Sequence, residues 1–172
     1  ATILNKKNIS HITSQPMPSF TPTEKRASLA LAGVFSLRMF GLFVILPVLA
    51  IYASNLSGGA NATGIGIAIG IYGLTQAVFQ IPFGRLSDFW GRKRTIYLGL
   101  LIFIIGSIVA ALAESLLLLS IGRAIQGAGA VSAVVIALVA DLTRDSVRTK
   151  AMAIIGVTIG FTFLLSIITG PL

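Results

Sequence analysis

The sequence predicts an all-α fold, a multi-pass bundle of transmembrane helices, and two observations lead to this prediction. The chain has 172 residues, of which 55% are hydrophobic and only 10% are charged. The charged residues gather between long apolar runs, and each run has about the ~20 residues that a helix needs to cross ~30 Å of hydrocarbon. This pattern excludes a soluble globular domain and a disordered chain.

Five helices are expected along the chain, at about residues 27–52, 63–83, 95–113, 116–140 and 151–172. Residues 1–26 are polar and contain several prolines, so they predict a tail, and Thr23 is expected to cap the first helix. The apolar run after the tail is too long for a cleavable signal. Turn-forming residues without charge follow the first helix, and Glu114-Ser115 forms a second turn without basic residues.

Two charged connections separate the remaining helices. Residues 84–94 hold two glycines and five charges between apolar runs, which predicts a tight, solvent-exposed hairpin connection. Residues 141–150 form the second charged connection. The first helix is interrupted by Arg38 and Pro47, and the fourth helix contains Arg123.

The distribution of lysine and arginine predicts the orientation in the membrane. Of the 13 basic residues, four lie in the tail, four in residues 84–94 and three in residues 141–150, while the other two connections hold none. The positive-inside rule therefore predicts a cytoplasmic N-terminus. The net charge of +8 is split among short segments and forms no continuous face, so we expect no nucleic-acid partner.

Three motifs resemble those of a known transporter family. Gly84, Leu86, Asp88, Gly91, Arg92 and Lys93 follow the pattern Gly-x-Leu-x-Asp-x-x-Gly-Arg-Lys, which in the major facilitator superfamily follows the second helix. Arg123, Gly127 and Gly129 are similar to its Arg-x-x-x-Gly-x-Gly motif in the fourth helix. Residues 166–171 resemble the fifth-helix motif of its proton-driven drug antiporters, with Ser166 in place of the first glycine.

This resemblance implies a specific architecture. Residues 27–172 would form part of the N-terminal half of a transporter with about twelve helices built from inverted repeats. The missing C-terminal half is therefore an expected partner, and the lipid bilayer surrounds both. The first two helices are most similar to YajR-type bacterial inner-membrane members, which implies a location in that membrane.

The motif after the second helix is the candidate conformational switch. Its residues are Gly84, Asp88, Gly91, Arg92, Lys93 and Arg94. The two glycines allow a sharp turn, and Asp88 can pair with Arg92 four residues later or lie at the positive end of a nearby helix. The resemblance implies that this segment latches the two halves of the transporter in one state. The alternative is that its charges only set the orientation in the membrane.

Two arginines are expected inside the membrane. An arginine at the centre of a bilayer is unfavourable by ~2.5–3.5 kcal/mol on insertion scales, so Arg123 and Arg38 should face the protein interior and have partners. The resemblance associates Arg123 with proton coupling, and the alternative is a structural contact with the first helix. Residues 40–46 hold no acidic side chain. The proton carrier is therefore expected outside this sequence, or Arg38 binds an anionic substrate.

A polar stripe on the second helix is the candidate substrate path. Tyr72, Gln76 and Gln80 recur at four-residue spacing. Gln126 lies one turn from Arg123 and could share its hydrogen bonds. Bonding between neighbouring helices is an equal alternative for the stripe. The small residues expected to permit close helix packing are Gly66, Gly70, Gly127, Gly129, Gly170 and Pro171.

These observations predict a secondary active transporter that works by alternating access and exports small amphipathic molecules in exchange for protons. Uptake of an anionic metabolite is one alternative, and a truncated membrane protein or assembly partner that does not transport is another. We expect no enzymatic activity, no cofactor and no metal, because the chain lacks cysteine and its only histidine, His11, lies in the tail.

Overall fold

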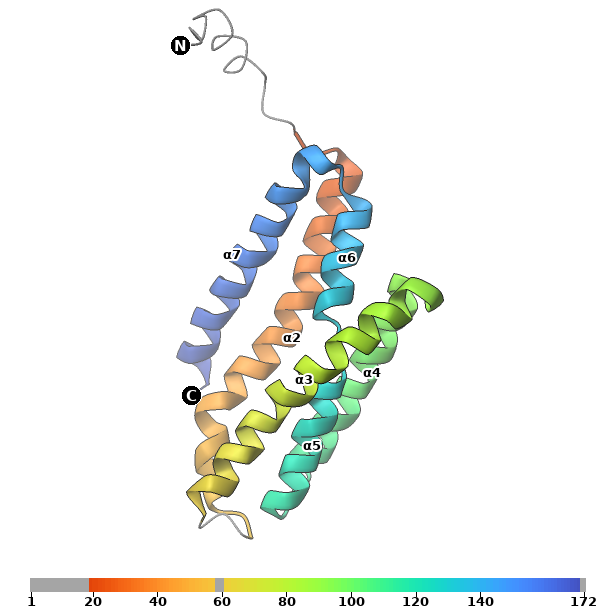
Figure 1. Ribbon diagram of the computed structural model, residues 1–172. Helices are drawn as coiled ribbons and strands as arrows, with labels where there is room; N and C mark the ends of the chain where they lie inside the picture. The colour runs from red at the N-terminus through yellow and green to blue at the C-terminus, as the bar shows by residue number, and fades with distance from the viewer. Residues whose placement is uncertain (1–18, 58–60, 171–172) are drawn as a thin grey trace, which may run out of the picture.

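The computed structural model describes residues 19–57 and 61–170, and these ranges contain six helices (Figure 1). In order they are α2 (Pro22–Ser54), α3 (Ala62–Trp90), α4 (Arg92–Ala111), α5 (Leu116–Ala128), α6 (Ser132–Leu142) and α7 (Asp145–Thr169). α5 and α6 together form one apolar span, so the described residues hold five segments able to cross a membrane. The all-α, multi-pass fold is confirmed.

α2 begins earlier than the sequence suggested, because a different threonine caps it. The Thr21 side chain accepts a hydrogen bond from the Glu24 backbone N–H, and the Glu24 carboxylate accepts one from the Thr21 backbone N–H. This reciprocal capping box lets the helix start at Pro22, which needs no N–H partner there. Thr23, the expected cap, lies inside the first turn. Residues 1–18 of the expected tail lie outside the described residues.

The charged connection at residues 84–94 is much shorter than expected. α3 continues through Trp90 instead of ending near residue 83, and α4 starts at Arg92 instead of near residue 95. Gly84 therefore lies inside α3 and is not part of a turn. The chain reverses at Gly91 alone, whose φ of 92° is accessible to glycine and strained for other residues.

The expected fourth helix, residues 116–140, is broken into α5 and α6. Gly129, Ala130 and Val131 separate the two helices. Residues 127–130 read Gly-Ala-Gly-Ala, and each glycine weakens a helix by ~1 kcal/mol relative to alanine. A built Cβ on Gly129 would meet the Gly99 backbone oxygen of α4, so the break lets two backbones approach closely. α7 also starts earlier than expected, at Asp145 instead of near residue 151.

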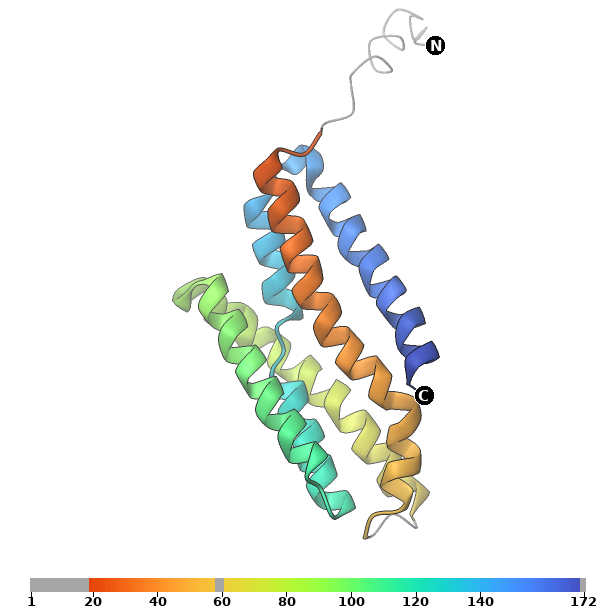
Figure 2. The same ribbon diagram turned by 180° about the vertical axis from the view of Figure 1, so that it is seen from behind.

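The helices pack around two separate apolar clusters. α5 packs between α3 and α4, whereas α2 runs beside α7, with α6 next to α2 (Figures 1 and 2). One cluster surrounds α6 and includes Phe35, Val135 and Ile155. The other surrounds α5 and includes Leu49 and Leu119. The break between α5 and α6 thus lies where the chain passes from one cluster to the other.

Some close helix contacts use glycines that the sequence analysis did not single out. A Cβ on Gly122 of α5 would lie 2.8 Å from Ala110 Cα of α4, and one on Gly106 of α4 would lie 2.8 Å from the Gly122 carbonyl oxygen. Gly127 lies against Tyr72 and Thr75 of α3, as its predicted packing role requires.

Two other predicted packing positions have no neighbour among the described residues. A Cβ on Gly66 or Gly70 would meet nothing within 4 Å, because these positions of α3 face away from the other described helices. Gly170 follows the last turn of α7, where its N–H donates to the Ser166 carbonyl oxygen at 2.8 Å. Pro171 lies outside the described residues.

Candidate functional site

A layer of polar side chains lies between the two apolar clusters. On α2, Arg38 comes between Phe35 of one cluster and Leu49 of the other. α3, α4 and the span formed by α5 and α6 show the same arrangement. Their polar residues in the layer are Tyr72, Gln76, Ser107, Arg123, Gln126 and Ser132. The layer therefore crosses the middle of the membrane-spanning segments, where polar groups must find partners within the protein.

Arg123 is enclosed by α3, α4 and its own helix. Its side chain is 1% exposed and donates a 2.9 Å hydrogen bond from Nη1 to Gln126 Oε1. Gln126 Nε2 in turn donates to Ser107 Oγ on α4 at 2.8 Å. The guanidinium carbon also lies 4.8 Å from the centroid of the Tyr72 ring, which is within cation–π range. The expected hydrogen bond to Gln126 is present, whereas no bond from Arg123 to α2 is found among the described residues.

Arg38 bridges the break between α5 and α6. Its Nη2 donates to the Gly129 carbonyl oxygen at 3.0 Å, and its Nη1 donates to Ser132 Oγ at 3.3 Å. The last carbonyls of a helix lack backbone donors and carry partial negative charge, so a guanidinium there satisfies and stabilises the helix end. A structural contact with the first helix was the alternative role for Arg123. The structure has such a contact between α2 and the break between α5 and α6, but Arg38 makes it.

The layer contains positive charge without a compensating carboxylate. The five acidic residues of the sequence all lie at or between helix ends: Glu24, Asp88, Glu114, Asp141 and Asp145. Four buried polar atoms of the layer also lack a hydrogen-bond partner in the described part of the chain: Arg38 Nε, Tyr72 OH, Gln76 Oε1 and Arg123 Nε. The layer can therefore accept an anion or further polar groups.

The predicted stripe on α3 is only partly drawn into this layer. Tyr72 is 6% exposed and packs on Arg123, and Gln76 is half-buried. Gln80 is half-buried one turn further on and makes no hydrogen bond among the described residues. Tyr72 and Gln76 thus belong to the interior, while the remainder of the stripe lies toward the end of α3.

The candidate switch motif forms a three-residue ion network. Arg92 lies 2.7 Å from Asp88, the expected partner four residues earlier, and 3.0 Å from Asp141 at the end of α6. Arg92 Nη1 also donates to Ser87 Oγ at 2.6 Å. Lys93 and Arg94 are exposed. The contact with Asp141 was not predicted, because the two residues are 49 positions apart and no local pattern joins them.

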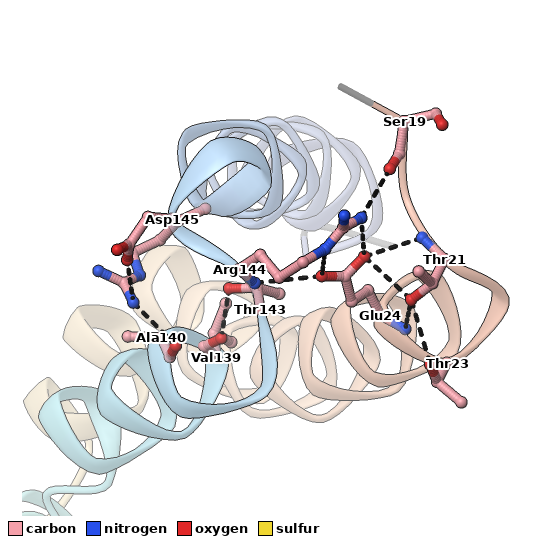
Figure 3. A network of polar contacts seen from close by, with 10 residues as sticks. Ser19, Thr21, Thr23, Glu24, Val139, Ala140, Thr143, Arg144 and Asp145 are labelled. Carbon is pink, nitrogen blue, oxygen red and sulfur yellow. Dashed lines mark hydrogen bonds and ion pairs between the residues drawn. The ribbon is translucent and has the colours of Figure 1, made fainter. Parts of the chain in front are cut away.

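A second ion network at the same end ties the start of α2 to the connection between α6 and α7 (Figure 3). Glu24 is 6% exposed and accepts hydrogen bonds from Arg144 Nε at 2.8 Å, Arg144 Nη2 at 3.0 Å and the Arg144 backbone N–H at 3.1 Å. Arg144 also donates to the Ser19 carbonyl oxygen at 3.0 Å. A Thr-x-x-Glu pattern at residues 21–24 signals the cap, but only the folded chain brings Arg144 to it.

These networks bring the basic segments to one end of the bundle. We call the end formed by residues 19–26, 85–94 and 141–150 the basic end. The opposite end holds the two connections without basic residues, where the Leu116 N–H donates to the Ser57 carbonyl oxygen at 3.1 Å and Tyr52 OH donates to the Ala113 carbonyl oxygen at 2.8 Å. No group of three or more His, Asp or Glu side chains that could hold a metal ion occurs within the described ranges.

Comparison with known proteins places these features in a family. The profile of the Major Facilitator Superfamily matches residues 31–172. The chain is 57% identical over 152 residues to Inner membrane transport protein YajR of Escherichia coli (strain K12), covering 88% of this chain and 33% of that protein.

Two further relatives extend this comparison. An uncharacterized transporter of Buchnera aphidicola subsp. Schizaphis graminum (strain Sg) is 50% identical over 149 residues, covering 87% of this chain and 38% of that protein. The class H tetracycline resistance protein of Pasteurella multocida is 32% identical over 134 residues, covering 77% of this chain and 32% of that protein. The chain thus spans about a third of the length of these curated relatives.

Proposed function

This chain belongs to the major facilitator superfamily, and from that premise we propose that it forms part of the first half of a proton-coupled exporter of small amphipathic molecules that works by alternating access. The family match confirms the resemblance that the three motifs indicated. The relatives carry the names of transporters, which supports transport over enzymatic activity. The chain covers about a third of them, so the remaining helices would supply the second half of the substrate path.

The polar layer is the observation that carries this proposal. A membrane helix interrupted near its middle is expected where backbone groups line a site or a moving interface, because hydrocarbon offers no replacement hydrogen bonds. Here the interruption at Gly129 lies next to two buried guanidinium groups and several polar atoms without partners. A purely structural bundle would fill the same space with apolar side chains at lower free energy.

The name of the tetracycline resistance relative supports a small-molecule drug as the substrate, and Arg123 supports coupling to protons. A fixed positive charge favours the ionised form of a nearby carboxyl group, so Arg123 would help a carboxylate on the missing half to release its proton. We also infer a bacterial inner-membrane location with a cytoplasmic N-terminus. The name of the YajR relative supports the inner-membrane location, and the basic end supports the orientation.

Everted membrane vesicles containing the complete transporter would test this function. With an inside-acid proton gradient, the exporter should accumulate ethidium or tetracycline inside the vesicles, and a protonophore should abolish the accumulation. Arg123→Gln should remove the dependence on the gradient, whereas Arg85→Gln, an exposed change of equal charge, should not. Gradient-driven accumulation that is equal in Arg123→Gln and the native protein would contradict the role of Arg123.

Uptake of an anionic solute is a second candidate, and the two buried arginines favour it. Arg38 and Arg123 have only neutral hydrogen-bond acceptors in the described structure, so an anion would compensate their charge. In that case right-side-out vesicles would accumulate an organic anion when the outside is acidic, and everted vesicles would show no export. The absence of any gradient-driven flux would instead favour a non-transporting assembly partner.

A further inference from the structure

A series of three hydrogen bonds joins Arg123 on α5 to the backbone of α4. Arg123 Nη1 donates to Gln126 Oε1 at 2.9 Å, and Gln126 Nε2 donates to Ser107 Oγ at 2.8 Å. Ser107 Oγ donates its own proton to the Phe103 carbonyl oxygen at 2.8 Å. Arg123 is 1% exposed and Gln126 is 6% exposed. The helices of this chain alone bury both side chains, so the series does not depend on other parts of the transporter.

The chemistry of the three side chains fixes the direction of each bond. A guanidinium group has only donors, so Gln126 must turn its Oε1 toward Arg123. The amide NH₂ group of Gln126 then faces α4, where a buried donor requires an acceptor. Ser107 Oγ is that acceptor, because its own proton is already donated to the Phe103 carbonyl oxygen. A side chain without a hydroxyl group at position 107 would leave the NH₂ group of Gln126 unsatisfied.

The packing of α4 on α5 keeps Ser107 and Gln126 together. A Cβ on Gly106, the neighbour of Ser107, would lie 2.9 Å from Gln126 Cα, so the two backbones are in contact at this level. On the α3 side, the centroid of the Tyr72 ring lies 4.8 Å from the Arg123 guanidinium carbon. A cation–π contact holds the guanidinium near the ring, whereas a hydrogen bond also sets its direction. Gln126 therefore sets the orientation of Arg123.

We propose that Ser107 is a positioning residue for Arg123, because it accepts a hydrogen bond from the Gln126 amide and so holds Gln126 Oε1 toward the guanidinium. The inference rests on the proposed role of Arg123 in proton coupling, and it adds a residue of α4 that lies outside the three family motifs. Without the hydroxyl group, Gln126 would turn to another acceptor and the Arg123 guanidinium would rotate. The distance from its charge to a carboxyl group would change, and so would their interaction.

Coupling can be measured in everted vesicles that contain the complete transporter. The readout is the ratio of ethidium accumulation with an inside-acid proton gradient to accumulation without it. Ser107→Ala should lower this ratio about fivefold, the equilibrium value of one neutral hydrogen bond. Ser107→Thr keeps the hydroxyl group and should retain most of the ratio. The matched control is Ser120→Ala on α5, which removes a hydroxyl group that donates to the Leu116 carbonyl oxygen of its own helix and should leave the ratio nearly unchanged.

A double substitution tests whether Ser107 acts through Gln126. In a Gln126→Leu background, Ser107→Ala should cause no further loss of the ratio, because residues of one hydrogen-bond network do not contribute additively. A purely structural effect of Ser107 would lower the ratio further in that background and would overturn the proposal. Equal losses in Ser107→Ala and Ser107→Thr, or in Ser107→Ala and Ser120→Ala, would also overturn it.

Nuclear magnetic resonance of isotope-labelled arginine, with the complete transporter in nanodiscs, gives a readout that does not require transport. The Arg123 signals are identified by their loss in Arg123→Lys. A guanidinium held by a directional hydrogen bond rotates slowly and shows separate Nη signals, which Ser107→Ala should merge and Ser120→Ala should not. Unchanged Arg123 signals in Ser107→Ala would overturn the positioning role even if export is coupled to protons. Native vesicles without gradient-driven accumulation would refute coupled export, whereas the signals would still decide the role of Ser107.

Discussion

Adding one methyl group to Gly122 should force α4 and α5 apart. The Cβ of an alanine there would lie 2.8 Å from Ala110 Cα and 2.9 Å from Ala110 Cβ, against about 3.4 Å for an ordinary contact. Because part of the obstacle is backbone, no rotamer change relieves it. Overpacking of this kind destabilises by ~1–3 kcal/mol, and the better helix propensity of alanine returns up to ~1 kcal/mol. We expect a net loss of about 1–2 kcal/mol for Gly122→Ala.

Reversible unfolding of the complete transporter in mixed detergent micelles would measure this difference. Gly70→Ala is the matched control, because a Cβ at Gly70 meets nothing within 4 Å. It should raise stability by up to ~1 kcal/mol through helix propensity alone. The two alanine substitutions should therefore shift the unfolding midpoint in opposite directions. Equal shifts, or a gain for Gly122→Ala, would refute the close packing of α4 on α5.

Three further changes test the polar contacts. Asp141→Asn removes one partner of Arg92 at an exposed site, so the free energy of unfolding should change by less than ~1 kcal/mol. The transport rate, and the labelling rate of a cysteine introduced at the basic end, should both change severalfold. Arg38→Met leaves the buried Gly129 carbonyl without its donor and should destabilise by ~1–3 kcal/mol, with faster hydrogen exchange in α6. Glu24→Gln removes a charged acceptor and should increase hydrogen exchange in residues 143–148.

Each of these changes has a control in the same chain. Asp145→Asn affects an ion pair whose carboxylate is 88% exposed, so it should leave exchange in residues 143–148 nearly unchanged. Arg38→Lys keeps a positive charge at the end of α5 and should recover part of the stability lost in Arg38→Met. Unchanged labelling in Asp141→Asn, or unchanged exchange in Arg38→Met or Glu24→Gln, would contradict the corresponding contact.

Short-range sequence patterns were sufficient to predict several features of the structure. Apolar runs of membrane-spanning length predicted the five spans, and the four-residue spacing of Asp88 and Arg92 predicted their 2.7 Å ion pair. The one-turn spacing of Arg123 and Gln126 likewise predicted their hydrogen bond. Such predictions succeed because helix geometry alone places residues three or four apart next to each other.

Helix ends were predicted less well, because local chemistry that competes with hydrophobicity decides them. The hydropathy pattern ended the second helix near residue 83, but polar residues continue it through Trp90 until Gly91 adopts a positive φ. The capping box at Thr21 also moved the start of α2 before its first apolar residue. The Thr-x-x-Glu signal was present in the sequence at that position.

That this chain is a multi-pass membrane protein of helices follows from its amino-acid sequence, because every long apolar run must satisfy its own backbone hydrogen bonds in hydrocarbon. Which charged groups meet depends on how the helices pack. Arg38 with Gly129, Arg92 with Asp141 and Glu24 with Arg144 join residues 49 to 120 positions apart. Such contacts depend on the relative tilt and rotation of whole helices, which close approaches at small residues set and which no local periodicity records.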